Sequence, residues 1–204
     1  LLSEINVDET EITGEYHSPQ LAEYVERAIY VCPDCGLSQF ESHGDIIECK
    51  KCGRKVQYLP DKTLKSADGR DLPFRFLADW YQYQGDFIRS LDLESYYDTP
   101  VYEDQGRLSE VILYDSKKLI AKDASLKLFG NRIEVSGGDF AACWNFDEVG
   151  TVTVLGKNKI NVYIGDKVYQ IKSGERFNAL KYVNIFHRHR NLSRGDEHGK
   201  FLGL

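Results

Sequence analysis

Two pairs of cysteines, each with CxxC spacing, constrain the fold of this chain more than any other feature. The first pair is Cys32 and Cys35, the second is Cys49 and Cys52, and a glycine follows each pair directly. Two thiolates on one tight turn can bind a single ion, and a second such turn completes the tetrahedral sulfur set that suits zinc. We therefore predict one structural zinc ion held by these four cysteines, in a zinc ribbon of short strands over residues 31–60.

Disulfide bonds or four unrelated thiols are the alternative interpretation of these cysteines. So short a segment, with few apolar residues, needs a metal ion or a cross-link to stay folded, which argues against unrelated thiols. No signal sequence is evident, so we expect a reducing cytoplasmic location, where paired CxxC turns usually bind metal. His43 lies between the pairs and is interpreted as a hairpin-loop residue, because four cysteines already fill the coordination shell. Lys50 and Lys51 are expected to offset the negative charge of a zinc tetrathiolate.

Composition and charge limit the other function classes. With 204 residues and 42% hydrophobic content, the chain has enough apolar residues for one main core and a small additional one. The formal net charge is -6, and residues 1–30 hold the acidic excess, so we interpret them as an acidic linker ending in a helix that starts near Ser18. An acidic chain without an aromatic-plus-basic strand motif is not expected to bind nucleic acid. The chain lacks methionine, and we expect it to be a piece of a longer protein.

From residue 108 onward, apolar and polar residues alternate in short runs, which is typical of β-strands. Seven or eight such runs are separated by turns with Gly, Asn and Asp, and a single helical segment over residues 174–192 follows them. This order predicts an α+β chain with a meandering antiparallel barrel closed by a C-terminal helix, which resembles the pleckstrin-homology-like architecture, including GRAM domains. The predicted order is an acidic linker and helix (1–30), the zinc ribbon (31–60), a helical connector (74–106), the pleckstrin-homology-like barrel with its helix (107–192) and a tail (193–204).

Trp80, Cys143 and the known nucleophile motifs were considered as possible signs of a catalytic or ligand-binding site. Trp80 falls on the apolar face of a helix predicted over residues 77–91, and we expect it to anchor a core. Cys143 lies in the strand-like run FAACW and is expected to be a small buried residue rather than a reactive thiol. The sequence offers no GxSxG elbow or comparable signature, so we predict no catalytic residue in this chain.

The end of the last predicted helix is locally basic and reads HRHR. Lys181, Arg188 and Arg190 are candidate contacts for an anionic headgroup or a phosphate. The alternative is a solvated helix end whose cations complement the negative end of the helix dipole. No apolar run in the chain reaches the length of a membrane-spanning helix, so any membrane contact is expected to be peripheral.

Four stretches of the sequence resemble a known region of lipid enzymes. These stretches are LAEYVERAIYVCPDCG, SHGDIIECKKCG, FRFLADWYQYQ and RFNALKYVNIFHRHRN. They resemble the C-terminal extension of some bacterial lysophosphatidic acid (1-acylglycerol-3-phosphate) acyltransferases. The catalytic domain of that family carries a His-x-x-x-x-Asp motif, which this chain does not contain. None of the family's catalytic residues can therefore be assigned to a position here.

The resemblance implies a non-catalytic accessory or regulatory domain of a phospholipid-biosynthesis acyltransferase. Its expected partner is the acyltransferase catalytic domain of the same parent chain, which it would place at a protein partner or at the anionic inner face of the membrane. The alternative is a protein-binding adaptor, built from a zinc ribbon and a pleckstrin-homology-like domain, that is unrelated to lipid chemistry.

Overall fold

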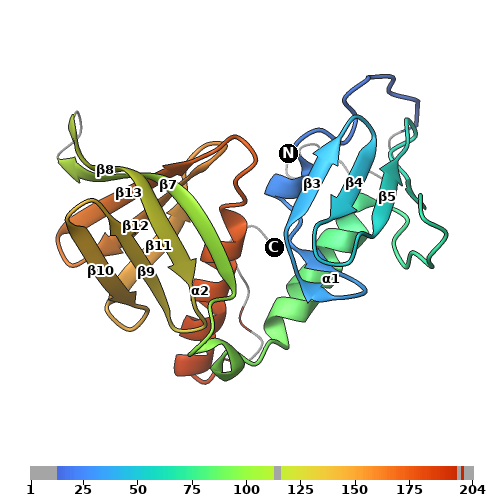
Figure 1. Cartoon of the computed structure of the whole chain (residues 1–204). Helices are drawn as coiled ribbons and strands as arrows, with labels where there is room; N and C mark the ends of the chain where they lie inside the picture. The colour runs from blue at the N-terminus through green and yellow to red at the C-terminus, as the bar shows by residue number, and fades with distance from the viewer. Residues whose placement is uncertain (1–12, 113–115, 197–198, 200–204) are drawn as a thin grey trace, which may run out of the picture. The chain divides into compact units, whose positions relative to one another are not determined.

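The computed structural model describes residues 13–112, 116–196 and 199, and it divides the chain into two compact units. Unit 1 is Leu1–Phe87 and unit 2 is Ile88–Leu204. Figure 1 shows small strands and a helix in unit 1, and a large curved sheet with a second helix in unit 2. None of the helices in the described residues is long and apolar enough to cross a bilayer.

Unit 1 is a ribbon of short antiparallel strands packed on a helix. The strands β3 to β6 form one sheet in the order β3-β4-β5-β6, and β1 pairs with β2. The hairpin between β3 and β4 turns at Gly44, whose φ of +63° favours glycine. The elements are η1 (Val25–Arg27), β1 (Val31–Cys32), β2 (Gly36–Leu37), β3 (Phe40–His43), β4 (Ile46–Cys49), β5 (Lys55–Tyr58), β6 (Leu64–Ser66) and α1 (Leu77–Arg89), of which the last extends just past the end of unit 1.

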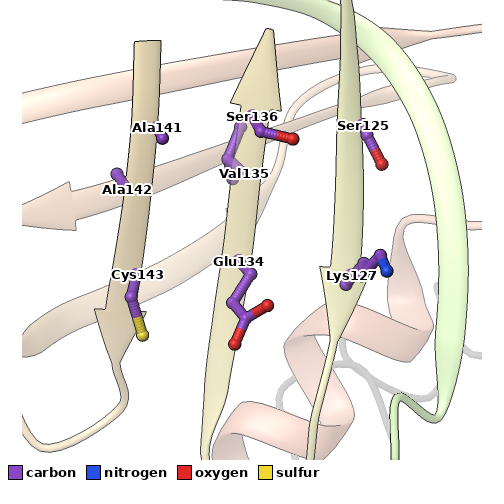
Figure 2. Close-up of a pocket in the computed structure, with 8 residues that line it drawn as sticks. All are labelled: Ser125, Lys127, Glu134, Val135, Ser136, Ala141, Ala142 and Cys143. Atoms are coloured by element: carbon purple, nitrogen blue, oxygen red, sulfur yellow. The ribbon is translucent and has the colours of Figure 1, made fainter.

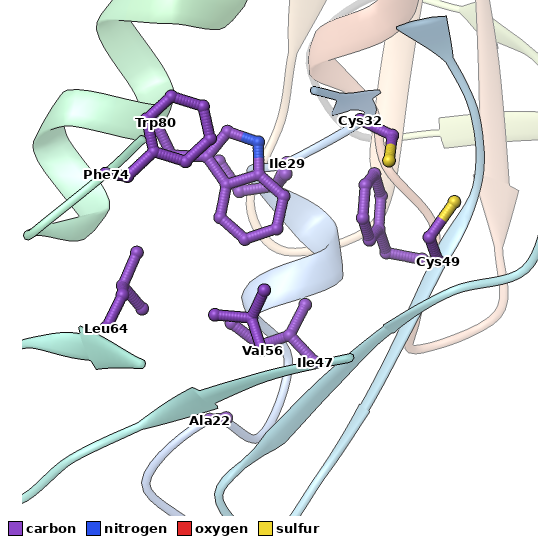
Figure 3. Close-up of a cluster of buried hydrophobic side chains, with 10 residues drawn as sticks. Ala22, Ile29, Cys32, Ile47, Cys49, Val56, Leu64, Phe74 and Trp80 are labelled. Carbon is purple, nitrogen blue, oxygen red and sulfur yellow. The ribbon is translucent and has the colours of Figure 1, made fainter. Parts of the chain in front are cut away.

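The core of unit 1 is built around Trp80, which is fully buried and confirms the predicted anchor. Its indole stacks on Phe74 with ring centroids 5.4 Å apart and meets the edge of Phe40 at the same centroid distance. Figure 3 shows Ile47 and Val56 of the sheet in the same cluster, with Cys32 and Cys49 at its border. The apolar core of the ribbon and the cysteine pairs are therefore one packed region.

Unit 2 is a seven-stranded antiparallel sheet followed by one helix. The strand order is β10-β9-β8-β7-β13-β12-β11, so the pairing of β7 with β13 joins a four-strand meander to a three-strand meander. β10 and β11 lie at the two ends of this order, and no hydrogen-bonded pairing between them closes the sheet in the described part of the chain. The elements are η2 (Glu94–Tyr96), β7 (Tyr102–Ile112), β8 (Ser116–Leu128), β9 (Arg132–Gly137), β10 (Phe140–Asn145), β11 (Val149–Val154), β12 (Lys159–Ile164), β13 (Lys167–Ser173) and α2 (Leu180–Ser193).

Alternation along these strands produces the core of unit 2. Leu108 on β7 and Ile171 on β13 are register partners and are both fully buried, as is Val162 on β12. α2 completes this core, since Ile185 and Phe186 are also fully buried. The α+β class and the pleckstrin-homology-like order of strands and helix, both predicted from the sequence, are thereby confirmed.

Several predicted elements differ in the structure. The helix predicted from Ser18 is wrong, because only Val25–Arg27 form a short 3-10 turn. Tyr24 adopts a left-handed φ of +71°, and the Ala22 N–H donates to the carbonyl of Gly44 in the ribbon hairpin at 2.7 Å. Tertiary hydrogen bonding therefore replaces the local helical bonds that the apolar spacing suggested. The start of the acidic linker, residues 1–12, and most of the predicted tail lie outside the described residues.

Strand boundaries also differ from those expected. β6 falls between the predicted ribbon (31–60) and the predicted helical connector (74–106), where no strand was expected. The stretches KLIAKDA and SLKLFG, each of which alternates like a separate short strand, belong to the single strand β8. The prediction that Cys143 is buried is wrong, because its side chain is exposed. The neighbouring Trp144 points inward and is buried, so strand alternation places Cys143 on the outer face.

Gly130 supplies a test of the packing of unit 2. A Cβ atom at this position would lie 2.2 Å from the backbone oxygen of Leu93, so an alanine cannot fit without moving backbone. We expect Gly130→Ala to lower the free energy of unfolding of unit 2 by about 1–3 kcal/mol, the usual cost of overpacking. Denaturant unfolding followed by the fluorescence of the two tryptophans, together with hydrogen exchange on β8 and β9, measures this loss.

Gly174→Ala is the matched control, because a Cβ atom at Gly174 meets nothing within 4 Å. This variant should unfold within about 0.5 kcal/mol of the parent chain. Equal stability of the two variants would contradict the close contact between Gly130 and Leu93.

Candidate metal centre

The four predicted ligand cysteines come together in unit 1. Their sulfur atoms all lie within 4.8 Å of one another. The Sγ atoms of Cys32 and Cys52 are 3.7 Å apart, and those of Cys35 and Cys49 are 3.6 Å apart. Each CxxC turn contributes one fully buried and one half-buried cysteine. Four sulfur donors at this spacing can hold a metal ion.

The two turns have the same local geometry, as expected from the glycine after each pair. Gly36 and Gly53 both adopt a φ of +72°, in the left-handed region where glycine has no steric cost. The first turn follows β1 directly, and the second follows β4, whose last residue is Cys49. His43, interpreted as a hairpin-loop residue, ends β3 next to the Gly44 turn, and Glu41 lies 3.1 Å from its ring nitrogen.

Burial acts against charge on the first pair of thiols. It raises the pKa of Cys32 far above the ordinary thiol value and raises that of Cys35 to about 11. Burial also acts upward on Cys52, but hydrogen bonds from the Arg54 backbone N–H and from the other thiols outweigh it and lower its pKa to about 7. A cation bound among the sulfurs would favour the thiolate form of all four side chains, which is how metal binding releases protons.

Two polar side chains that the sequence analysis did not name contact the sulfurs. Ser38 places its hydroxyl 3.0 Å from the Sγ of Cys49, and the guanidinium of Arg70 donates to the Sγ of Cys52 at 3.7 Å. Lys50 instead pairs with Glu41 at 2.7 Å. Lys51, the other lysine expected to offset charge, donates to the carbonyl of Cys35 at 3.1 Å rather than to a sulfur.

Two arginines that the sequence analysis missed brace the first CxxC turn. Arg54 is buried and its guanidinium pairs with the carboxylate of Asp34, between Cys32 and Cys35. Arg70 donates to the other oxygen of Asp34 at 2.9 Å and is itself held by Asp68 at 2.6 Å. Arg70 lies in a turn distant in sequence from the cysteines, so CxxC spacing gave no signal for it. The aspartate inside the first turn was the available clue, since a half-buried carboxylate needs a partner.

Gln84 of α1 holds the chain that enters the first turn. Its side chain is fully buried, and its amide oxygen accepts hydrogen bonds from the N–H groups of Tyr30 at 2.7 Å and Val31 at 3.2 Å. Its amide nitrogen donates to the carbonyl of Ala28 at 3.0 Å. The indole N–H of Trp80, one turn earlier, donates to the carbonyl of Val31 at 2.8 Å. Helix α1 therefore fixes the backbone that leads directly into Cys32.

Among the candidate anion contacts in unit 2, Lys181 is engaged inside the fold. Its side chain is only 3% exposed, and its Nζ atom lies 2.7 Å from a carboxylate oxygen of Asp104. The hydroxyl of Tyr182 donates to the same oxygen at 2.7 Å. Burial lowers the pKa of Lys181, while the charge of Asp104 acts in the opposite direction. This lysine ties the start of α2 to β7.

The other two candidate cations also donate to backbone oxygens of unit 2. Arg188 is buried and its Nε atom donates to the carbonyl of Leu91 at 3.3 Å. Arg190 donates to the carbonyl of Gly150 at 2.7 Å. The structure therefore does not gather Lys181, Arg188 and Arg190 into one exposed basic patch, and their role as headgroup contacts stays a prediction.

Comparisons with known proteins give two partial similarities. No protein-family model matches the chain. A 33-residue segment is 42% identical to an Arabidopsis thaliana protein described as DNA-directed RNA polymerases II, IV and V subunit 12, and it represents 16% of this chain and 65% of that protein. The N-terminal pleckstrin-homology domain of human ARAP2 aligns with 45% of this chain and 81% of its own, at 14% identity and a TM-score of 0.35. Neither similarity shows a family for the chain.

The contacts of Gln84 provide a test of how the centre is held. Leucine at this position would leave two buried N–H groups and one carbonyl without their partner, so we expect Gln84→Leu to destabilise unit 1 by roughly 2–4 kcal/mol. Hydrogen exchange at Tyr30 and Val31 should accelerate in the variant, and the affinity of the cysteine cluster for metal should fall.

Gln82→Leu is the matched control, because Gln82 lies on the exposed face of the same helix. It should change stability by less than about 0.5 kcal/mol. If Gln84→Leu behaves like Gln82→Leu, the buried amide does not hold the first turn.

Proposed function

We propose that Cys32, Cys35, Cys49 and Cys52 hold one structural zinc ion. Ligand atoms at the corners of a tetrahedron, each about 2.3 Å from zinc, lie about 3.8 Å apart. The two Sγ pairs at 3.6 and 3.7 Å match that edge, which is the observation that carries this proposal. Zinc is favoured over other metals because it binds four thiolates in tetrahedral geometry and is not redox-active.

The proposed ion would have a structural role only. A catalytic zinc keeps one position open for water or substrate, whereas four thiolates complete the tetrahedral shell. Zinc bound here would join both CxxC turns to the apolar core that surrounds Cys32 and Cys49. Binding to a comparable site stabilises the folded form by on the order of 10 kcal/mol near neutral pH.

Cys49→Ser tests this assignment. We expect the full chain to contain about one zinc per molecule and the variant to contain almost none, because a serine hydroxyl is a poor replacement for a thiolate. Elemental analysis measures the metal, and hydrogen exchange should show loss of protection over β3, β4 and β5 with little change in unit 2. A strong chelator should have the same local effect on the parent chain.

Cys143→Ser is the control, since Cys143 is exposed and belongs to unit 2. Its metal content and exchange should match the parent chain. A Cys49→Ser protein with unchanged zinc would remove the proposed site.

We further propose that the chain is a non-catalytic accessory module that places a phospholipid-synthesis acyltransferase at an anionic membrane surface. The acyltransferase context rests on the resemblance of the four sequence stretches. Membrane contact is supported by one end of the sheet in unit 2, where the end of β7 and the start of β8 lie beside the start of β13. Val111 on β7 is the register partner of both Lys117 on β8 and Val168 on β13.

This end combines exposed apolar and basic side chains. Ile112 is 44% exposed and Leu119 is 45% exposed, and both are large hydrophobic residues. Lys118 and Lys167 are exposed at this end of the sheet, as is Lys117, whose Nζ atom donates to the side chain of Gln170 at 2.6 Å. Apolar side chains that enter the headgroup region, together with lysines that attract anionic lipid, are a common basis for peripheral binding.

Sedimentation with lipid vesicles tests the membrane proposal. The zinc-loaded chain should pellet with vesicles containing phosphatidic acid more than with phosphatidylcholine vesicles, and added salt should weaken the binding. Replacing Lys118 with glutamate should reduce the pelleted fraction several-fold. Lys157→Glu, on the tip between β11 and β12 at the opposite end of β12, should have a much smaller effect.

Equal sedimentation with both lipids at low salt would exclude this membrane role. Capture of a defined protein, unchanged by lipid, would then favour the adaptor function.

A further inference from the structure

The edge of β10 is the least protected strand edge of unit 2. β10 is the first strand in the sheet order and pairs only with β9. Its pairing with β9 runs from Phe140 to Asn145 without a register shift, and this segment contains no charged residue and no proline. Natural sheets usually protect an edge with a charge, a proline, a bulge or a covering element.

The opposite edge, β11, has such protection. Its pairing with β12 is shifted between Val149 and Thr151. Arg190 of α2 donates to the carbonyl of Gly150 inside that irregularity at 2.7 Å. A helix side chain thus blocks the β11 end of the sheet, and in the described residues no such side-chain contact is found on the backbone of β10.

The hydrogen-bond pattern identifies which backbone groups β10 offers. The N–H of Phe146 donates to the carbonyl of Asn131 at 2.9 Å, which fixes the phase of the ladder with β9. Because antiparallel partners alternate between bonded and non-bonded pairs, the N–H and C=O groups of Ala141 and Cys143 point away from β9. Within the described residues β10 has β9 as its sole strand neighbour, so no other strand pairs with these groups. An added strand could therefore bond to both residues.

A shallow hollow of about 460 Å³ lies on the outer face beside this edge. Figure 2 shows its side chains in two rows across β8, β9 and β10, and the register confirms both rows. One row is Ser125, Ser136 and Ala141, and the other is Lys127, Glu134 and Cys143. The side chains nearest the edge are small, so they leave room for alternate side chains of an additional strand.

The charges around β10 indicate what kind of strand would fit. Asp139 precedes the strand, and Asp147 and Glu148 follow it, all exposed. In a two-fold antiparallel pairing of two copies, Asp139 of one chain would lie near Asp147 and Glu148 of the other, which is unfavourable. An uncharged strand with basic residues at both ends would instead complement the acidic flanks.

We propose that β10 is a docking edge for an extended peptide segment of a partner protein, which joins the sheet as an extra antiparallel strand. The segment would have an uncharged, β-prone centre and Lys or Arg at each end. Backbone hydrogen bonds to Ala141 and Cys143 would supply affinity, and the hollow and the acidic flanks would supply selectivity. This surface is independent of both the cysteine cluster and the proposed membrane-facing end.

A fluorescein-labelled probe peptide tests the docking edge on the full, zinc-loaded chain. The probe has six alternating threonine and valine residues between pairs of arginines, and a second probe has glutamates in place of the arginines. We expect saturable binding of the basic probe by fluorescence anisotropy and at least about ten-fold weaker binding of the acidic probe. The amides of Ala141 and Cys143 should gain hydrogen-exchange protection on binding.

Cys143→Pro removes one of the offered N–H groups, and an edge strand tolerates proline where that group faces solvent. This variant should bind the basic probe at least about ten-fold more weakly, whereas Cys143→Ser should remain within about two-fold of the parent chain. Circular dichroism verifies the fold of both. A double variant, Asp139→Lys with Asp147→Lys, leaves the strand itself unchanged and should invert the preference between the two probes.

Three results would overturn the proposal. The first is no saturable binding of the basic probe up to about 1 mM. The second is binding that neither the folded Cys143→Pro chain nor the double variant alters. The third is a dimer in analytical ultracentrifugation that Cys143→Pro dissociates, which would assign the edge to a second copy of the chain.

Discussion

Unit 1 depends on bringing four thiols to one point inside a small apolar core. Burial opposes charge on Cys32 and Cys35, so these two thiols stay protonated unless a cation binds near them. The two glycine turns aim the thiols, and the buried contacts of Gln84 and Trp80 fix the strand that carries Cys32. The helix, the hairpins and the apolar core of unit 1 therefore all contact the cysteine cluster. A metal ion bound there would stabilise all of them together.

Unit 2 is stabilised differently, by an extensive core of buried apolar side chains from its strands and from α2. Its sheet is held by the pairing of β7 with β13, and α2 is tied to β7 by the buried contacts of Lys181 and Tyr182 with Asp104. Removing one partner of such a buried ion pair usually costs more stability than the intact pair contributes, because the remaining charge is buried without a counter-charge. Lys181, at the start of α2, thus serves the fold.

The functional proposals for this chain rest on its surfaces. Four thiolates around the proposed ion would leave no open coordination position, and the buried polar groups of unit 2 described above are bonded within the fold. Two surface features of unit 2 carry the binding proposals, namely the end of the sheet around Ile112 and Leu119 and the edge of β10. They lie in the same unit but differ in chemistry, since one combines apolar side chains with lysines and the other offers backbone hydrogen bonds between acidic flanks. Binding is the function that such surfaces can perform.

The sequence by itself determined the features that depend on local spacing. CxxC pairs followed by glycine indicated the sulfur cluster, strict alternation indicated most strands of unit 2, and apolar spacing indicated α1 with Trp80 in the core. Other features were decided by tertiary structure alone. The segment after Ser18 forms hydrogen bonds with the ribbon instead of the helix that its spacing predicts, and the guanidinium of Arg70 contacts Cys52 from a turn distant in sequence. Likewise, only the sheet order made β10 an edge strand. Local patterns fix which way a side chain points along its own element, but the neighbours that satisfy its hydrogen bonds and charge come from segments far away in the chain.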